Sequence, residues 1–234
     1  MNKDVIVALD FGNKAEALAF LKPFKESIYV KIGMELYYSV GPSIIREIKA
    51  LNHKIFLDLK LHDIPHTVAR TMQVLKNLDV DMVNCHCAGG LKMMQEAKKA
   101  LTGTNCKVIG VTQLTSTSST MLRDELLIAK DMNEVIISNA RLAKKAGLDG
   151  VVCSPLEAKL IHEAVGVNFL TICPGIRYES GKDDQIRVTT PRLARELTCD
   201  YIVVGRPITQ AQDPVAMYHR IRNEFLETPK AVEN

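Results

Sequence analysis

Three charged residues, Asp58, Lys60 and Asp63, stand within six positions at the end of an apolar run. In an extended strand the side chains alternate between two faces, so Asp58 and Lys60 share one face and the leucines around them share the other. Two charges in a confined site are costly to desolvate unless they are paired. The pattern therefore predicts an ion pair between Asp58 and Lys60.

Lys60 is the residue of this group that can do chemistry, because neighbouring carboxylates keep a lysine protonated. A protonated lysine can stabilise a carbanion and donate a proton, whereas a Schiff-base nucleophile needs the neutral amine. Asp63 stands three residues later, where Ile64 and Pro65 break the strand, so alternation does not say where its side chain points. The residues indicate acid catalysis by Lys60 and leave the direction of Asp63 open.

A second group of residues suits a phosphate. Gly205 and Arg206 follow an apolar run and offer backbone amides and a guanidinium fork, in the region where many barrel enzymes bind phosphate. The segment from Gly175 to Pro191 is long, polar and contains glycine, as an active-site lid would be. A surface loop with no catalytic part has the same composition, so the segment alone does not decide between them.

The elements that must position these residues are eight short apolar runs rich in valine and isoleucine. They begin at Val5, Ile28, Lys54, Asp81, Lys107, Leu148, Asn168 and Asp200. Helical periodicity lies between them, and a further helix is expected around residues 120–130. A capping oxygen precedes a proline at residues 154–155, 190–191 and 213–214, which predicts three helix starts. Gly147 predicts the end of a helix that begins near Asn133.

Strict alternation of strands and helices predicts a parallel sheet, and eight such units without a linker fit a single (β/α)8 barrel domain. The domain would span residues 1–234, with a short tail after about residue 228. A doubly wound open sheet is the alternative architecture. In a barrel all strands end on one face, where barrel enzymes hold their active sites. Polar residues gather at those ends, namely Asp10, Lys31, Asp58, Lys60, His86, Thr112, Thr115, Arg177 and Arg206. Strand ends are exposed to solvent in any sheet, which alone could account for polar residues there. Solvent exposure does not explain why the amino-terminal halves of the strands hold so few ionisable residues.

The composition excludes other classes of function. The chain has 234 residues and a formal charge of +3, and its lysines and arginines are scattered along the sequence. It therefore lacks the clustered basic residues that are typical of a nucleic-acid-binding protein. The first apolar run stops at Asp10 and is too short for a signal peptide or a membrane span, which predicts a cytoplasmic protein. Six cysteines in or beside strand-like runs are expected to be reduced and buried. Cys85 and Cys87 share one strand face and His86 the other, so no metal site is predicted there.

At this point the chain resembles the orotidine 5′-phosphate decarboxylase family in its bacterial form. The family signature Asp-x-Lys-x-x-Asp-Ile-Pro-x-Thr stands intact from Asp58 to Thr67. Other matching segments follow in order along nearly the whole chain: ALD, VKIGMEL, VNCHCAGG, VTQLTS, PGIR with DDQ, and VGRPI. The family often carries Asn where this chain has His66, at a variable position of the signature.

The resemblance implies a role for each matching residue. Lys60 would be the catalytic proton donor, held between Asp58 and Asp63. The family is a homodimer in which the second aspartate crosses the interface, so Asp63, Ile64 and Thr67 would serve the partner's site. The implied substrate contacts are Asp10 and Lys31 for the ribose, Thr115 for the pyrimidine, Arg177, Gln185, Gly205 and Arg206 for the phosphate, and Pro174 beside them.

The reaction implied by the resemblance converts orotidine 5′-monophosphate (OMP) to UMP and CO2 in pyrimidine synthesis, without metal or cofactor. Lys60 would stabilise charge at C6 and then protonate it. The nearest alternative is a sugar-phosphate lyase of the same superfamily, such as 3-keto-gulonate 6-phosphate decarboxylase or hexulose-phosphate synthase. These lyases use Mg²⁺ held by an acidic residue on the second strand, where Lys31 would repel the cation. A catalytically silent phosphate-binding barrel is the alternative from a different class.

Overall fold

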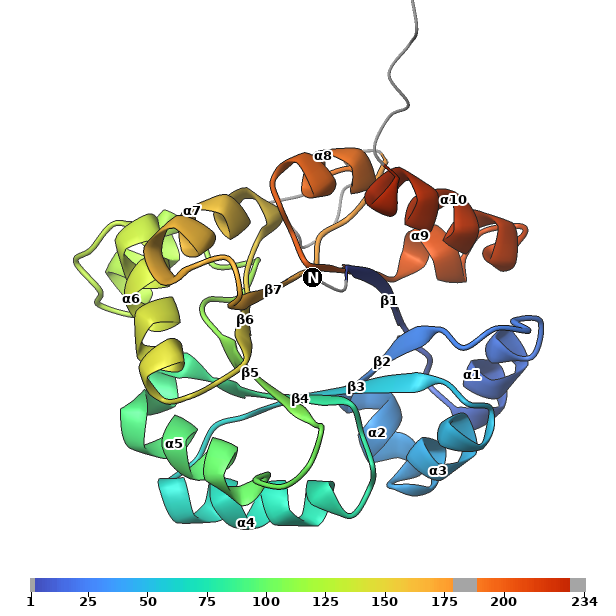
Figure 1. Cartoon of the computed structure of the whole chain (residues 1–234), viewed down its shortest axis with the longest axis horizontal. Coiled ribbons are helices and arrows are strands. Elements are labelled where there is room, and N and C mark those ends of the chain that lie inside the picture. Colours follow the sequence, from blue (N-terminus) through green and yellow to red (C-terminus); the bar gives the residue numbers. More distant parts are fainter. Residues whose placement is uncertain (1–2, 179–188, 228–234) are drawn as a thin grey trace, which may run out of the picture.

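The computed structural model describes residues 3–178 and 189–227, in which eight parallel strands close into a barrel with helices on the outside (Figure 1). Each strand pairs with the next in sequence, and the last closes on the first. The strands are β1 (Asp4–Ala8), β2 (Tyr29–Gly33), β3 (Lys54–Leu61), β4 (Met82–His86), β5 (Lys107–Val111), β6 (Gly150–Val152), β7 (Leu170–Cys173) and β8 (Tyr201–Val204). The predicted (β/α)8 barrel is confirmed and the open sheet is excluded. The predicted tail after residue 228 lies outside the described residues.

Helices follow the strands and begin where the capping residues predict. They are α1 (Lys14–Leu21), α2 (Met34–Val40), α3 (Ser43–Ala50), α4 (Pro65–Lys76), α5 (Gly90–Ala100), α6 (Met132–Lys145), α7 (Pro155–Val165), α8 (Pro191–Glu196), α9 (Arg206–Thr209) and α10 (Pro214–Leu226), with a 3₁₀ turn η1 (Cys87–Gly89). Ser154, Thr190 and Asp213 each accept a hydrogen bond from a backbone amide of the helix they precede. Gly147 has φ +83° just past α6, as predicted.

The prediction of a helix around residues 120–130 is wrong in its extent. In that segment the structure has a five-residue π-type turn, η2 (Met121–Glu125), directly after two helical residues at 119–120. Leu127 adopts a left-handed conformation with φ +55° and is 82% exposed, so neither its backbone nor its side chain supports a continuing helix.

Two apolar layers hold the barrel together, as expected when both faces of a parallel sheet are buried. One layer fills the inside of the barrel with side chains from the strands: Ile6, Ala8, Tyr29, Phe56, Met82, Ile109, Ile172, Tyr201 and Val203. The other layer lies between the strands and the helices and includes Leu57 and Leu59 of β3. The interior is therefore packed with side chains, and a pocket can form only at its mouth.

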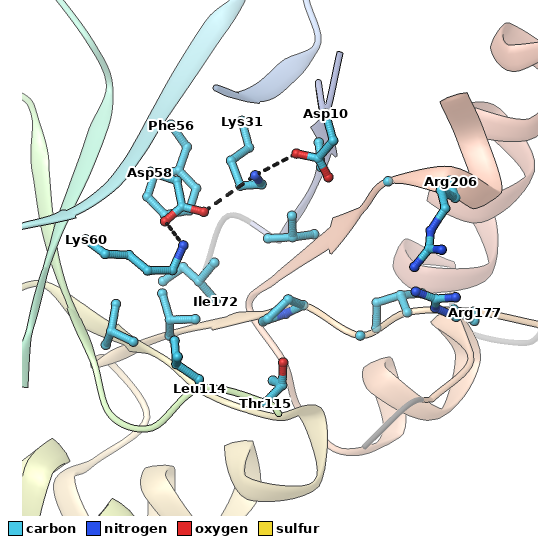
Figure 2. A pocket seen from close by; sticks show the side chains of 18 of the residues that line it. Asp10, Lys31, Phe56, Asp58, Lys60, Leu114, Thr115, Ile172, Arg177 and Arg206 are labelled. Atoms are coloured by element: carbon cyan, nitrogen blue, oxygen red, sulfur yellow. Dashed lines mark hydrogen bonds and ion pairs between the residues drawn. The ribbon is translucent and has the colours of Figure 1, made fainter. Parts of the chain in front are cut away.

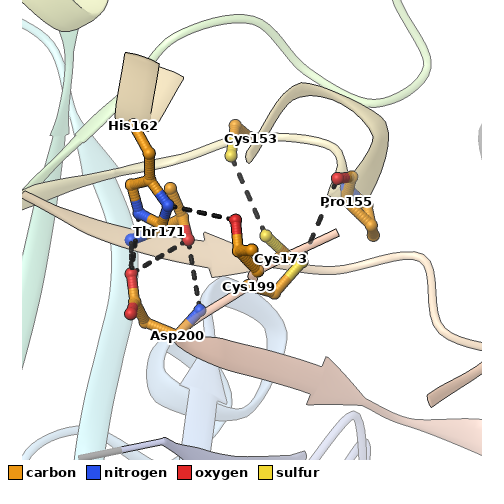
Figure 3. A network of polar contacts seen from close by, with 8 residues as sticks. Cys153, Pro155, His162, Thr171, Cys173, Cys199 and Asp200 are labelled. Carbon is orange, nitrogen blue, oxygen red and sulfur yellow. Dashed lines mark hydrogen bonds and ion pairs between the residues drawn. The ribbon is translucent and has the colours of Figure 1, made fainter. Parts of the chain in front are cut away.

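A buried polar network ties α7 to the amino ends of β7 and β8, away from the mouth (Figure 3). One oxygen of Asp200 accepts from the backbone N–H of Thr171 at 2.9 Å, and His162 Nε2 lies 3.1 Å from the same oxygen. Near this network, Cys153 and Cys173 Sγ lie 3.8 Å apart. All six cysteines are free and five are buried, which confirms the prediction except for the half-buried Cys106.

None of the helices in the described ranges has both the length and the apolar character needed to cross a bilayer.

Candidate active site

A pocket of about 270 Å³ opens at the carboxyl ends of the strands (Figure 2). Residues that follow or end seven of the eight strands line it, β4 being the exception. The sequence-predicted residues in its lining are Asp10, Lys31, Asp58, Lys60, Thr115, Pro174, Arg177, Gly205 and Arg206. Closure of the barrel thus brings together residues up to almost 200 positions apart in the chain.

Four of these residues form a row of alternating charge. Lys31 Nζ lies 3.1 Å from an oxygen of Asp10 and 3.5 Å from Asp58 Oδ2, and Lys60 Nζ donates to Asp58 Oδ1 at 2.8 Å. The predicted ion pair between Asp58 and Lys60 is confirmed. The row continues through Lys31 to Asp10, so each charge inside the row faces charges of the opposite sign on both sides.

Burial and pairing act in opposite directions on the ionisation of the inner members. Burial on its own would raise the pKa of Asp58, but the charges of Lys31 and Lys60 and hydrogen bonds from Lys60 and Asn84 bring it below its ordinary value. Burial would lower the pKa of Lys31, but Asp58 and Asp10 raise it above its ordinary value. Both groups are therefore charged at neutral pH.

The Asp58 carboxylate should make stability depend on acid. Its folded-state pKa lies below the unfolded value of about 3.8, so its stabilising contribution is present above that pH and is lost as the pH falls through the lower folded value. Asp58→Asn should lower the free energy of unfolding by about 3 kcal/mol at pH 7, because it leaves Lys60 without its carboxylate partner and Lys31 with Asp10 alone. Denaturant titrations from pH 7 to pH 2 should show this difference shrinking below about pH 4. A matched change at exposed Asp79, to Asn, should show little difference at any pH, and a constant gap for Asp58→Asn would contradict the assignment.

The backbone at Lys60 departs from the regular strand that the alternation argument assumed. Pairing between β3 and β4 shifts register between Leu57 and Leu61, and Lys60 has φ +50°. Lys60 still faces Asp58, and the leucines still pack outward. The predicted faces were therefore right, but an irregular strand and not simple alternation aims Lys60 into the pocket.

Two guanidinium groups, those of Arg177 and Arg206, lie together at the end of the pocket away from Lys60 (Figure 2). Arg177 follows β7 and Arg206 begins α9 after β8. The backbone N–H of Arg177 donates to Thr189 O at 2.8 Å, and Thr189 N donates to Gly175 O at 3.0 Å. These bonds join the two ends of the predicted 175–191 lid beside the arginines. The predicted phosphate ligand Gln185 lies outside the described residues.

The remaining three predicted residues do not line the pocket of their own chain. Asp63, Ile64 and Thr67 stand in and after the turn that joins β3 to α4. The carboxylate of Asp63 accepts from the N–H of Ile64 at 2.7 Å, and the Ile64 side chain is 66% exposed. Asp58 therefore lines the pocket and Asp63 does not, although the two residues are only five positions apart in the sequence.

Sequence reasoning missed several contributors to the site. Asn84 of β4 contacts Asp58 and Lys60, and its signal was a polar residue at an inward-facing strand position between Met82 and His86. Gly33 leaves room for the charged row, since a Cβ there would lie 3.1 Å from Lys31 Nζ. His86, in contrast, was among the polar residues predicted at this end of the barrel. Burial lowers its pKa, and the nearby charges of His62 and Lys60 lower it further. No group of three or more metal-ligating side chains was found in the described part of the chain.

The chain is similar to known proteins in sequence and in fold. The family model for the orotidine 5′-phosphate decarboxylase / HUMPS family matches residues 3–221. Proteins named orotidine 5′-phosphate decarboxylase from Staphylococcus epidermidis and Staphylococcus aureus are 54% and 53% identical over 224 residues, covering 94% of this chain and 97% of theirs. The crystal structure of the enzyme of that name from Lactobacillus acidophilus is 40% identical, covers 97% of this chain and 100% of its own, and superposes with a TM-score of 0.88.

Proposed function

Because the chain belongs to the orotidine 5′-phosphate decarboxylase / HUMPS family, we propose that it is a carboxy-lyase that converts OMP to UMP and CO2. The observation that carries the proposal is the row of alternating charge that ends at Lys60, with two guanidinium groups at the other end of the same pocket. The product would serve pyrimidine nucleotide synthesis, and a cytoplasmic location suits a charged nucleotide that does not cross a bilayer unaided.

The proposed substrate lies along the pocket with its phosphate between Arg177 and Arg206. Guanidinium forks bind phosphate oxygens through charge-assisted hydrogen bonds. The ribose hydroxyls would then lie near Asp10 and Lys31, and the pyrimidine near Thr115, which brings C6 toward Lys60. Pro174, Gly205 and Gln185 complete the proposed contacts. Binding of the remote phosphate and ribose supplies the energy that positions the ring.

In the proposed reaction, the bond between C6 and its carboxylate breaks and CO2 leaves, with the electron pair remaining on C6. The ammonium of Lys60 stabilises this pair as it develops and then donates a proton to C6, and the resulting amine is reprotonated from solvent. Asp58 orients the ammonium of Lys60 through the 2.8 Å hydrogen bond. No redox or Schiff-base step is required of these residues.

We further propose that the enzyme is a homodimer with sites shared between subunits. Asp63 does not contact Lys60 of its own chain, and it stands beside exposed Ile64 on a turn that also precedes Thr67. In the proposed dimer these three residues enter the other subunit's pocket, where Asp63 would flank Lys60 on the side opposite Asp58. Two carboxylates would then hold one ammonium.

The family also includes enzymes that act on sugar phosphates with Mg²⁺, and the second strand argues against that reaction here. Lys31 of β2 points into the pocket between two carboxylates, so its ammonium occupies the place of a cation. A divalent ion close to this charge would be strongly repelled.

Spectrophotometry of OMP with the purified protein tests the proposal. The ultraviolet absorbance of OMP should fall as UMP forms, at an unchanged rate after treatment with EDTA. An absence of turnover, or activity that returns only when Mg²⁺ is added, would overturn it. The first result would favour a silent phosphate-binding barrel, and the second a metal-dependent lyase.

Arg206→Ala should weaken substrate binding with little effect on the chemical step. A hydrogen bond to a charged group contributes about 1.5–3 kcal/mol, so KM should rise by about 10- to 100-fold. Steady-state kinetics with OMP measures this, and Arg192→Ala, on the exposed face of α8, is the matched control. An unchanged KM would contradict the assignment of the phosphate to this end of the pocket.

A further inference from the structure

Asn84 is a buried polar residue that neither the family signature nor the proposed contacts include. Its side chain is 1% exposed and points from β4 toward β3. Its Oδ1 accepts from the backbone N–H of Lys60 at 2.8 Å, and its Nδ2 donates to Asp58 Oδ1 at 2.7 Å. The amide orientation is fixed by chemistry, because a backbone N–H can only donate and a carboxylate can only accept.

These two bonds replace missing ladder contacts between the strands. Leu57 pairs with Val83, but the next pair along is Leu61 with Cys85, so three residues of β3 lie opposite Asn84 alone. Bulged residues lose their regular backbone partners. The side chain of Asn84 supplies an acceptor for the backbone N–H of Lys60 in a partly buried setting.

The backbone of Lys60 also needs an external restraint. Its φ of +50° lies in the left-handed region, which is unfavourable for a residue with a side chain. Such conformations persist where surrounding contacts over-determine them, and they are concentrated at functional sites. At Lys60 the restraints are the bond from its backbone to Asn84 and the bond from its Nζ to Asp58.

We propose that Asn84 is a positioning residue for the decarboxylation, holding Lys60 and Asp58 in the one arrangement that aims the ammonium at C6. Asn84 does not line the pocket, so it acts through these two residues and touches no substrate. The inference rests on the proposed function for its kinetic part and on geometry alone for its structural part.

Asn84→Leu removes both hydrogen bonds at similar volume and tests the proposal first. We expect kcat for OMP to fall by about 100-fold, since misplacement by about 1 Å can cost that much, while the Kd for UMP changes by less than about threefold. Val83→Ala, on the opposite face of β4, is the control for lost stability alone and should keep kcat within about threefold. A folded Asn84→Leu enzyme with wild-type kcat, or with kcat and UMP affinity reduced equally, would overturn the proposal.

Asn84→Asp separates positioning from packing through its pH profile. The new carboxyl can accept from Lys60 at any pH, but it can donate to Asp58 only when protonated, and burial beside Asp58 raises its pKa. Its kcat relative to wild type should therefore recover as the pH is lowered from 8 to 5, whereas Asn84→Leu should show no such recovery. The neighbouring titratable groups are Asp58, Lys31, Lys60, His62 and His86, and Asn84→Leu, which adds no charge beside them, controls for their own titration. A ratio that stays constant with pH would count against the role.

A crystal structure of Asn84→Leu tests the same proposal without any assay. Lys60 should leave the left-handed conformation, and its 2.8 Å contact with Asp58 should be lost. If both features persist, Asn84 does not position Lys60, whatever reaction the protein catalyses. If wild-type protein fails to turn over OMP while these features are lost as expected, the proposed function fails and the positioning role stands.

Discussion

Lys60→Ala is expected to lower the turnover of OMP by about 10⁴-fold or more, because general acid catalysis and electrostatic stabilisation each contribute about 100-fold or more. The alanine removes both effects at once, since one ammonium stabilises the charge on C6 and then donates the proton. UMP should still bind within about tenfold of wild type, because Lys60 lies at the end of the pocket away from Arg177 and Arg206. Single-turnover kinetics and UMP titration measure the two quantities separately.

Two further variants control for loss of charge and for nonspecific damage. Lys60→Arg keeps the charge but carries a planar guanidinium that stays protonated, so it should remain at least about 100-fold impaired. Lys92→Ala, on the exposed face of α5, should have normal activity. Near-normal turnover by Lys60→Ala would remove Lys60 from the mechanism.

Asp63→Ala should also inactivate the enzyme, and mixing it with Lys60→Ala should restore activity. In a shared dimer, the Asp63→Ala subunit supplies an intact Lys60 and the Lys60→Ala subunit supplies an intact Asp63, so each hybrid dimer has one complete site. With random exchange half of the dimers are hybrids, and about a quarter of the wild-type activity should return. The assay is OMP turnover as a function of the mixing ratio, with a maximum near equal amounts.

Subunit exchange must be demonstrated in the same samples, for example by copurification of one variant through an affinity tag on the other. Each variant alone, taken through the same mixing procedure, should remain inactive. If hybrid dimers form and no activity returns, Asp63 does not serve a site across an interface.

The barrel and the Asp58–Lys60 pair could be predicted from the sequence because both depend on local patterns. Apolar runs of strand length mark the strands, and period-two alternation predicted Asp58 and Lys60 on one face, although the irregular end of β3 sets the direction of Lys60. Capping oxygens before prolines predicted the starts of α7, α8 and α10. These signals lie within a few residues of the features they determine.

The rest of the site depends on contacts between distant parts of the chain. The left-handed backbone of Lys60 is held by Asn84, 24 residues away, and no local pattern encodes that bond. The predicted helix at residues 120–130 was wrong beyond Glu125, where the helical backbone ends and Leu127 adopts a left-handed conformation, although these residues are mostly good helix formers. The direction of Asp63 was left open by alternation, and the structure shows only that it avoids its own pocket.

A crystal structure of the purified protein with UMP bound is the decisive test of the proposed reaction. We expect the phosphate between Arg177 and Arg206, C6 of the pyrimidine about 3 Å from Lys60 Nζ, and Asp63 of a second subunit beside that lysine. A ligand with its pyrimidine turned away from Lys60, or with its phosphate bound away from the two arginines, would contradict the proposed function.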